Sequence, residues 1–257
     1  MRNKMTLAGT IVALGLAAST LVIPSFAQPM PPDDSTGANE ATDKPTSAAG
    51  AESVMRVASA MQLIRYAREY ESPVAMLAAV EMMQTVRVRE SETLEGTLEA
   101  MDSSADPSAG KVSRDAQPPV LEAETLLAEA REWAAGNPEI LEMIDTAMDK
   151  ARDRPRSAVT MGAVGGPKYN IERAPARTAV NYDINFEAGK LARIAVIGDS
   201  DTDLDLIVLD QNGNRITADV DDSDFCIVQW TPRWTGDFRI VVVNHGSVWN
   251  EYIIVTN

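Results

Sequence analysis

The chain has 257 residues and a formal net charge of −15 at pH 7, from 38 acidic and 23 basic side chains. A chain this acidic lacks the basic surface that nucleic acids and anionic membranes require, so both are excluded as partners. Its single cysteine, Cys226, excludes an internal disulfide, and with one histidine, His245, the chain cannot supply the several Cys and His ligands of a structural zinc site.

The first 27 residues have the pattern of a secretory signal peptide. Arg2 and Lys4 precede an apolar run that ends at Pro24, and Ser25-Phe26-Ala27 places small residues at both key cleavage positions. We therefore expect cleavage before Gln28, export to the periplasm or the extracellular space, and no membrane span in the mature chain. The alternative is an uncleaved anchor, but the run is marginal in length for a span and contains Gly, Ser and Thr.

Residues 28–50 lack aromatic and large aliphatic side chains apart from Met30. Such a segment cannot bury enough apolar surface to offset the entropy lost on ordering. We therefore predict a disordered tether here.

Residues 51–152 predict a helical domain, because Ala, Leu, Met, Glu and Arg dominate. A weak repeat relates "LIRYAREYESP" at 63–73 to "LLAEAREWAAGNP" at 126–138. In each copy an aromatic residue ends one helix, and a capping residue followed by proline begins the next, at Ser72-Pro73 and Asn137-Pro138. Two copies favour a compact antiparallel bundle over a solenoid.

The second helix of each copy carries apolar residues at helical spacing: Met76, Val80 and Met83 in one, Leu141, Ile144 and Met148 in the other. Leu94, Leu98 and Met101 predict a further helix. Six methionines lie between residues 55 and 101. They either fill the core, which is the simpler interpretation, or line an adaptable groove for peptides.

Residues 153–178 contain Pro155, Pro167 and Pro175 among glycines and basic residues. This composition predicts a linker, or an extended segment lying on the next domain. Because the period of the apolar pattern changes across it from 3.6 to 2, we predict two independently folded units on its two sides.

Residues 179–257 predict an antiparallel β-sandwich, since short strands recur there at roughly ten-residue spacing. The expected strands are "VNYDINFE", "LARIAVIG", "DLDLIVL", "RITADV", "FCIVQW", "DFRIVVVN" and "EYIIVT". Cys226 lies in an apolar run and is expected to be buried. Trp230 and Trp234 are expected in the core, and Trp249 at an exposed contact. The fold class is thus α+β multidomain, with a helical bundle followed by a jelly-roll-like sandwich.

This last region resembles the bacterial pre-peptidase C-terminal domain family. The matching residues are "DTDLDLIVLDQNGN" at 201–214, "WTPRWTGDFRIVVVN" at 230–244 and "YIIVT" at 252–256, and the resemblance covers about a third of the chain. It implies a jelly-roll-type sandwich of the kind appended to secreted enzymes, itself non-catalytic, and in some members bound to calcium or extracellular polymers. No peptidase precedes the domain here, so the resemblance implies a module that serves the helical region or acts alone.

The aspartates of residues 198–224 predict a possible ion site. "DQNGN" predicts a hairpin turn with Gly213 left-handed, in a register that pairs Asp210 with Asn214. The alternative Asn-Gly turn is rejected because it sets the apolar side chains of the first strand against Asp219 and Asp221.

The accepted register places Asp203 opposite Asp221 and Asp205 opposite Asp219, and like charges directly opposite each other destabilise a ladder. Either water screens these carboxylates, or a structural Ca²⁺ binds Asp203, Asp205, Asp219 and Asp221, with Asp201 adding a ligand from the preceding loop.

The sequence shows no catalytic constellation. His245 lies in the polar loop "NHGS" without a nucleophile motif beside it. No phosphate-binding loop fits, whereas a pair of carboxylates that hydrolyses glycosidic bonds remains open. We expect a secreted or periplasmic non-catalytic binding or adaptor protein with a protein or extracellular polymer as partner. The alternative is a hydrolase, or an accessory to one, that acts on an extracellular polymer.

Overall fold

The computed structural model describes residues 37–46, 49–86, 89–91, 94–101, 122–153 and 167–257. The expected signal peptide and its cleavage site lie outside these residues. Within them, no helix combines the length and the apolar character needed to cross a membrane.

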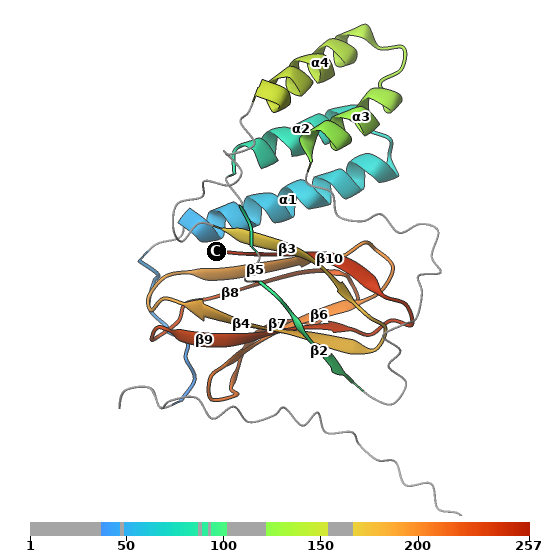
Figure 1. Ribbon diagram of the computed structural model, residues 1–257. Helices are drawn as coiled ribbons and strands as arrows, with labels where there is room; N and C mark the ends of the chain where they lie inside the picture. The colour runs from blue at the N-terminus through green and yellow to red at the C-terminus, as the bar shows by residue number, and fades with distance from the viewer. Residues whose placement is uncertain (1–36, 47–48, 87–88, 92–93, 102–121, 154–166) are drawn as a thin grey trace, which may run out of the picture.

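Two five-stranded sheets face each other as the layers of a β-sandwich (Figure 1). The first sheet has the order β1 (Arg89–Glu90), β3 (Lys168–Ala174), β10 (Asn250–Thr256), β5 (Ala192–Ile197) and β8 (Phe225–Trp230). The second has the order β2 (Thr97–Ala100), β4 (Thr178–Phe186), β9 (Gly236–Asn244), β6 (Leu204–Asp210) and β7 (Arg215–Asp219). All pairs are antiparallel except β1 with β3. The seven predicted strands are confirmed, as β4 to β10.

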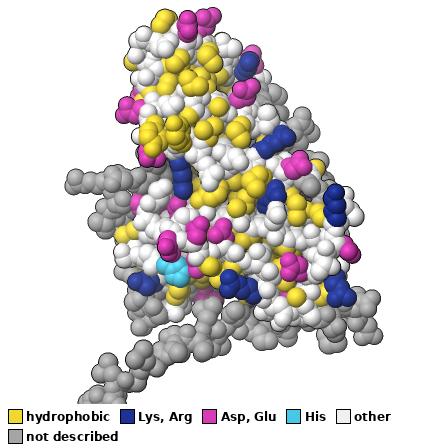
Figure 2. Space-filling view, turned by 180° about the vertical axis from the view of Figure 1, so that it is seen from behind, with side chains coloured by type: hydrophobic (Ala, Val, Ile, Leu, Met, Phe, Trp, Pro, Cys, Tyr) yellow, Lys and Arg dark blue, Asp and Glu magenta, His cyan; other side chains and the backbone are white. Residues whose placement is uncertain are grey.

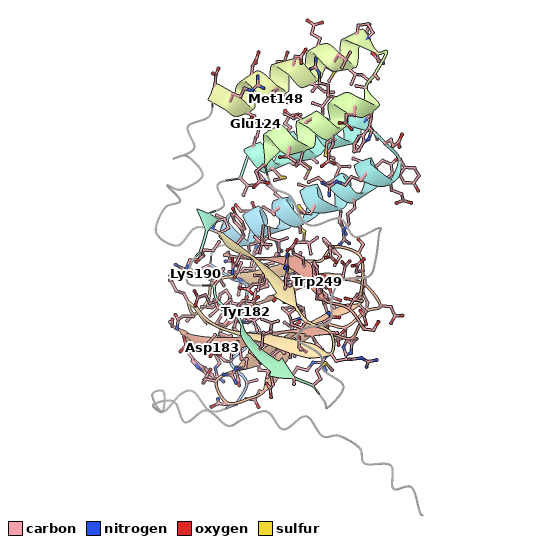
Figure 3. All side chains as sticks on the ribbon, turned by 45° about the vertical axis from the view of Figure 1, so that its right-hand side comes forward. Glu124, Met148, Tyr182, Asp183, Lys190 and Trp249 are labelled. Carbon is pink, nitrogen blue, oxygen red and sulfur yellow. The ribbon has the colours of Figure 1, made fainter. Side chains whose placement is uncertain are left out.

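The inner faces of the two sheets form one apolar core because alternate side chains of each strand point inward. Trp230, Phe186 and Phe238 pack edge-on and tilted against one another, with ring centroids 4.8 to 5.9 Å apart. Tyr182, labelled in Figure 3, lies within the sandwich. Its hydroxyl group meets that of Tyr252 on the other sheet, with the two oxygens 2.5 Å apart. Trp230 is thus a core residue as expected, and Cys226 is buried, also as expected.

Three strands arise outside the region predicted for the sandwich. The segment around Leu94, Leu98 and Met101, predicted as a helix, instead contributes β2, and Leu94 is buried in the sandwich core. Residues 168–174, assigned to the linker, form β3, which pairs along its whole length with β10. The helix prediction was wrong because long-range pairing overrode local propensity. For residues 168–174 the structure favours the second interpretation, an extended segment lying on the next domain, so the sandwich begins well before residue 179.

The four helices are α1 (Ala49–Glu69), α2 (Pro73–Gln84), α3 (Ala123–Trp133) and α4 (Pro138–Asp153). Both predicted helix starts are confirmed: the backbone N–H of Ala75 donates to Ser72 Oγ, and that of Ile140 donates to Asn137 Oδ1. The two helix–helix turns differ in the residue that comes directly before the capping residue. The second has Gly136 at φ +89°, whereas the first has Glu71 at φ +45°, in the left-handed region that favours glycine.

The helices form a stack on the sandwich and not the predicted compact bundle (Figure 1). α1 lies on the outer face of β5 and β10, and α2, α3 and α4 follow as successive layers. Buried residues of all four helices share one core with Ala195, Ile197, Ile253 and Val255 of the sheet. The two regions are therefore not the independent units that the sequence predicted. Met61 and Met76 fill this core, as the simpler interpretation of the methionines held, while Met55 is exposed.

Residues 37–46 lie along the sandwich, so the predicted tether is wrong for this part. Asn39 is fully buried: its backbone N–H donates to Asp210 Oδ2, and its side chain exchanges hydrogen bonds with the backbone of Trp234. Further along, the N–H of Thr46 donates to the carbonyl of Gly189. Backbone and amide hydrogen bonds hold the segment, and these do not require the apolar side chains that it lacks. We call residues 37–46 the N-terminal strap.

Candidate functional site

Asp203, Asp205 and His245 come together at one end of the sandwich. β6 pairs with β9 so that Leu204 lies opposite Asn244 and Asp205 opposite Val243. Continuing this register places His245, just past the end of β9, opposite Asp203, and the His245 N–H donates to the Asp203 carbonyl over 3.2 Å. Ligand atoms of the three side chains lie within 4.8 Å of one another. The group is half-buried, and carboxylates gather beside the histidine on this face (Figure 2).

The predicted register of β6 and β7 holds at the turn and fails beyond it. The Asp210 N–H donates to the Asn214 carbonyl, and Gly213 has φ +79°, both as predicted. A bulge between Val208 and Leu209 then shifts the pairing by one residue, so that Leu206 lies opposite Asp219. Beyond the bulge, β6 and β7 therefore pair in the register that the sequence analysis rejected for the Asn-Gly turn. β7 is an edge strand, and a strand that is buried on neither face constrains the register weakly.

Because of that shift, the predicted Asp203–Asp221 and Asp205–Asp219 pairs do not form. Asp219 instead accepts a hydrogen bond from the Ile227 N–H, 2.8 Å away on the facing edge strand β8. Asp221 accepts from the Ser223 N–H, 3.0 Å away in its own loop. Asp201 lies in the loop before β6 and does not belong to the group of Asp203, Asp205 and His245. Of the five predicted ligands, the structure therefore brings two together, and it adds His245.

Sequence reasoning missed His245 as a member of this group. The position of "NHGS" directly after a predicted strand could have pointed to His245. The sequence alone, however, did not show that this strand, β9, lies beside β6. His245 Nε2 and Asp205 Oδ2 are 2.8 Å apart and form an ion pair when the ring is protonated. His245 thus gives the Asp205 carboxylate a hydrogen-bond partner, whereas it makes no such side-chain contact with Asp203.

The pKa of Asp203 is raised above its usual range. Partial burial is the largest cause, the negative charge of Asp205 is the next, and His245 acts in the opposite direction. Asp222 and Asp221 add smaller repulsive contributions. The Oδ1 atom of Asp203 is also buried without a hydrogen-bond partner. Asp203 is therefore the carboxylate of the group that would gain most from a proton or a cation.

The donor set fits calcium poorly. Ca²⁺ takes six to eight oxygen ligands, whereas this group offers two carboxylates and an imidazole. Imidazole with carboxylates suits borderline cations such as Zn²⁺ or Ni²⁺ better. If a cation binds, Asp203, Asp205 and His245 would hold it, and its positive charge would offset the repulsion between the two carboxylates.

The arrangement offers no activated cysteine for nucleophilic catalysis. Cys226 points into the sandwich, where its Sγ lies 2.9 Å from the Leu204 carbonyl oxygen, and burial raises the pKa of the thiol far above its usual value. The thiol therefore stays protonated, and His245 faces Asp205 instead. A thiolate–imidazole pair is thus excluded for these two residues.

A clamp joins the same loop end to the helices. The Arg65 guanidinium of α1 donates to Asp224 Oδ1 over 2.8 Å and to the Gly198 carbonyl over 2.6 Å. Asp224 is buried, and its other oxygen accepts from the Ser200 N–H. Gly198 leaves no room for a side chain, since an added Cβ would lie 2.4 Å from Asp224 Oδ2. The loops on either side of the acidic group are therefore fixed to α1.

The two other tryptophans of the sandwich have partners at its ends. Trp249, expected at an exposed contact, is half-buried, and the guanidinium of Arg173 lies 4.5 Å from its ring centroid (Figure 3). Trp234, expected in the core, is half-buried beside the strap residue Asn39. Neither residue presents the open aromatic platform that binds sugars.

Fold and site together define a helix-capped antiparallel β-sandwich. No protein-family model matches the chain, and no curated protein matches it. Among solved structures it is similar to the pre-peptidase C-terminal domain of a collagenase from Bacillus anthracis, with 12% identity over 34% of this chain and 87% of that chain, at a TM-score of 0.27.

It is also similar to a periplasmic inhibitor of g-type lysozyme from Aeromonas hydrophila, with 13% identity over 38% of this chain and 90% of that chain, at a TM-score of 0.30. A third similar structure is the C-terminal CBM6 of a marine laminarinase from Zobellia galactanivorans, with 14% identity over 35% and 90%, at a TM-score of 0.22. The relationship to the pre-peptidase C-terminal domain is a distant one of fold, and no ligand or activity follows from it.

Proposed function

We propose that this protein is an exported, non-catalytic binding protein whose sandwich carries the helical stack as the platform that binds a protein partner. The distribution of exposed apolar side chains carries the proposal. Eight large apolar side chains are exposed in the described part of the chain, and five of them belong to the helical stack. Met55, Tyr66, Val74 and Met143 lie on helices, and Tyr70 lies in the turn directly after α1. Exposed aromatic and Met side chains are enriched at protein interfaces.

The way the stack is attached supports this role. α1 shares its apolar core with β5 and β10, and Arg65 fixes it to the loops of the sandwich. A platform held by a common core keeps its surface in one geometry, which lowers the entropic cost of binding. Export rests on the signal-peptide pattern of residues 1–27.

A structural cation at Asp203, Asp205 and His245 is a secondary proposal. Such an ion would support the loop end of the sandwich, because its ligands come from β6 and the segment after β9.

The test is capture from an extract of cells that produce the protein, with four charge-introducing variants beside the wild type. Met55→Arg, Tyr66→Arg and Met143→Arg each alter one part of the stack, and Val220→Arg alters an exposed apolar residue of the sandwich as the matched control. We expect a partner that at least one stack variant loses and that Val220→Arg retains. A partner lost on Val220→Arg alone would refute the platform role and favour the alternative, an accessory module that binds an extracellular polymer through the sandwich.

A further inference from the structure

The turn between α1 and α2 carries an aromatic surface that the fold does not use. Tyr66 and Tyr70 stack one helical turn apart, with ring centroids 4.7 Å apart and an interplanar angle of 36°. Their exposed fractions are 51% and 61%, and Val74, at the start of α2, is 53% exposed. We call these three residues, with Glu69 and Glu71, the corner patch. Apolar side chains gather at this end of the stack on the face that also carries the acidic group (Figure 2).

The charge on the corner patch is negative. Glu69 and Glu71 are both exposed. The two arginines of this end of α1 have their guanidinium groups bound elsewhere: Arg65 to Asp224, and Arg68 to both oxygens of Glu129. The carboxylate of Glu69 also raises the pKa of the Tyr70 hydroxyl, so negative charge lies against the ring.

The backbone at the corner patch is strained for the residue it carries. Glu71 has φ +45°, a conformation that costs a non-glycine residue roughly 1 kcal/mol. The equivalent turn of the second hairpin has Gly136 and is free of that cost. A glutamate at a position where glycine would fit better points from the strain toward a role for its carboxylate.

We infer that the corner patch binds a basic segment of a partner protein, in which Lys or Arg side chains pair with Glu69 and Glu71 while flanking apolar side chains cover Tyr66, Tyr70 and Val74. A guanidinium also binds favourably over a tyrosine ring, so the aromatic pair and the two carboxylates recognise the same chemistry. The inference rests on the proposed function and names the partner chemistry for one part of the platform.

The test is selection of a phage-displayed random dodecapeptide library on the purified chain, followed by fluorescence anisotropy with the enriched peptides. We expect enrichment of Lys and Arg next to apolar residues. The double variant Tyr66→Ala/Tyr70→Ala should bind these peptides about thirtyfold more weakly, as for interface residues that carry most of the binding energy. Val220→Ala, at an exposed apolar residue of the sandwich, is the matched control and should not change the affinity.

Charge is tested separately with Glu69→Gln/Glu71→Gln, against Glu139→Gln/Glu142→Gln on α4, which removes the same charge from another exposed surface. The first pair should weaken binding about three- to tenfold and reduce its salt dependence, and the second pair should leave both unchanged. Peptides without basic enrichment that still require the two tyrosines would overturn the inference while leaving the platform role intact. Peptides that bind the tyrosine variant as well as the wild type, or no enrichment at all, would overturn the corner patch as the site.

Discussion

Replacing Asp203 by asparagine separates the two explanations of the acidic group, because they predict effects of opposite sign. Without a cation, Asp203→Asn removes a charge that Asp205 repels within 4.8 Å. Two unit charges at that separation repel by about 1 kcal/mol in a water-like dielectric, and by several kcal/mol at an effective dielectric constant of 20. Since His245 offsets part of this repulsion and Asp203 stays partly exposed to water, the lower figure applies best, and we expect the variant to be more stable by about 1 kcal/mol at pH 7.

The pH dependence of the stability follows from the raised pKa of Asp203. The pKa of Asp203 is raised in the folded state, so the folded chain holds more protons than the unfolded chain between the ordinary pKa of an aspartate and the raised value. Wild-type stability should therefore fall as pH rises through that window, and the advantage of Asp203→Asn should appear over the same window. Below the ordinary aspartate pKa both states are protonated, and this contribution to the difference disappears.

The assay is urea unfolding followed by tryptophan fluorescence from pH 4 to 8, first with a chelator and then with Ca²⁺ or Zn²⁺. Asp43→Asn makes the same charge change at an exposed residue of the strap and is the control. If a cation binds, it should stabilise the wild type and not Asp203→Asn, so the order of the two stabilities reverses when the metal is added. A variant that is less stable than the wild type in chelator would refute the repulsion argument, and an unchanged midpoint with either metal would remove the cation.

Three further changes test the contacts that join the parts of the fold. Asn39→Ala should lower the free energy of unfolding by about 2–3 kcal/mol, because it leaves the Trp234 backbone groups without partners, whereas Thr42→Ala in the same strap should have little effect. Asp224→Ala should cost about 2–3 kcal/mol and speed hydrogen exchange in α1, because Arg65 loses its buried partner; equal exchange rates would contradict the clamp. Glu71→Gly should raise stability by up to about 1 kcal/mol in thermal unfolding while weakening any basic peptide that the corner patch binds.

Local patterns predicted the elements that are stabilised locally. The seven strands from β4 to β10 each carry an apolar pattern that a single strand explains, and the proline-led starts of α2 and α4 are set by residues next to them. β1 and β2 could not be found this way. One has two residues and the other is exposed along its length, so both exist through pairing with β3 and β4.

The candidate site shows the same limit. Alternation with leucine identified Asp203 and Asp205 as neighbours on one strand face. Their third partner, His245, follows from the β6–β9 pairing, which joins residues about forty positions apart. Asp219 and Asp221 were lost to a single bulge in β6, which no residue type in that strand indicates. Asp201, in the loop before β6, lies outside the group. The strap was missed for a different reason: a rule that counts apolar side chains cannot detect order that comes from hydrogen bonds to Asn39.

One sequence pattern that the prediction did not use indicates that the helices pack against the sandwich. In a sheet with one wet face, apolar and polar residues alternate, whereas a strand covered on both faces is apolar throughout. The run "IAVI" in β5 and "YIIV" in β10 do not alternate, and every residue in them is buried. One set of these side chains fills the sandwich, and the other set, Ala195, Ile197, Ile253 and Val255, packs against α1. Two adjoining strands without a polar face therefore required a further layer. α1 is that layer, so the first helix of the proposed binding platform also forms one wall of the core.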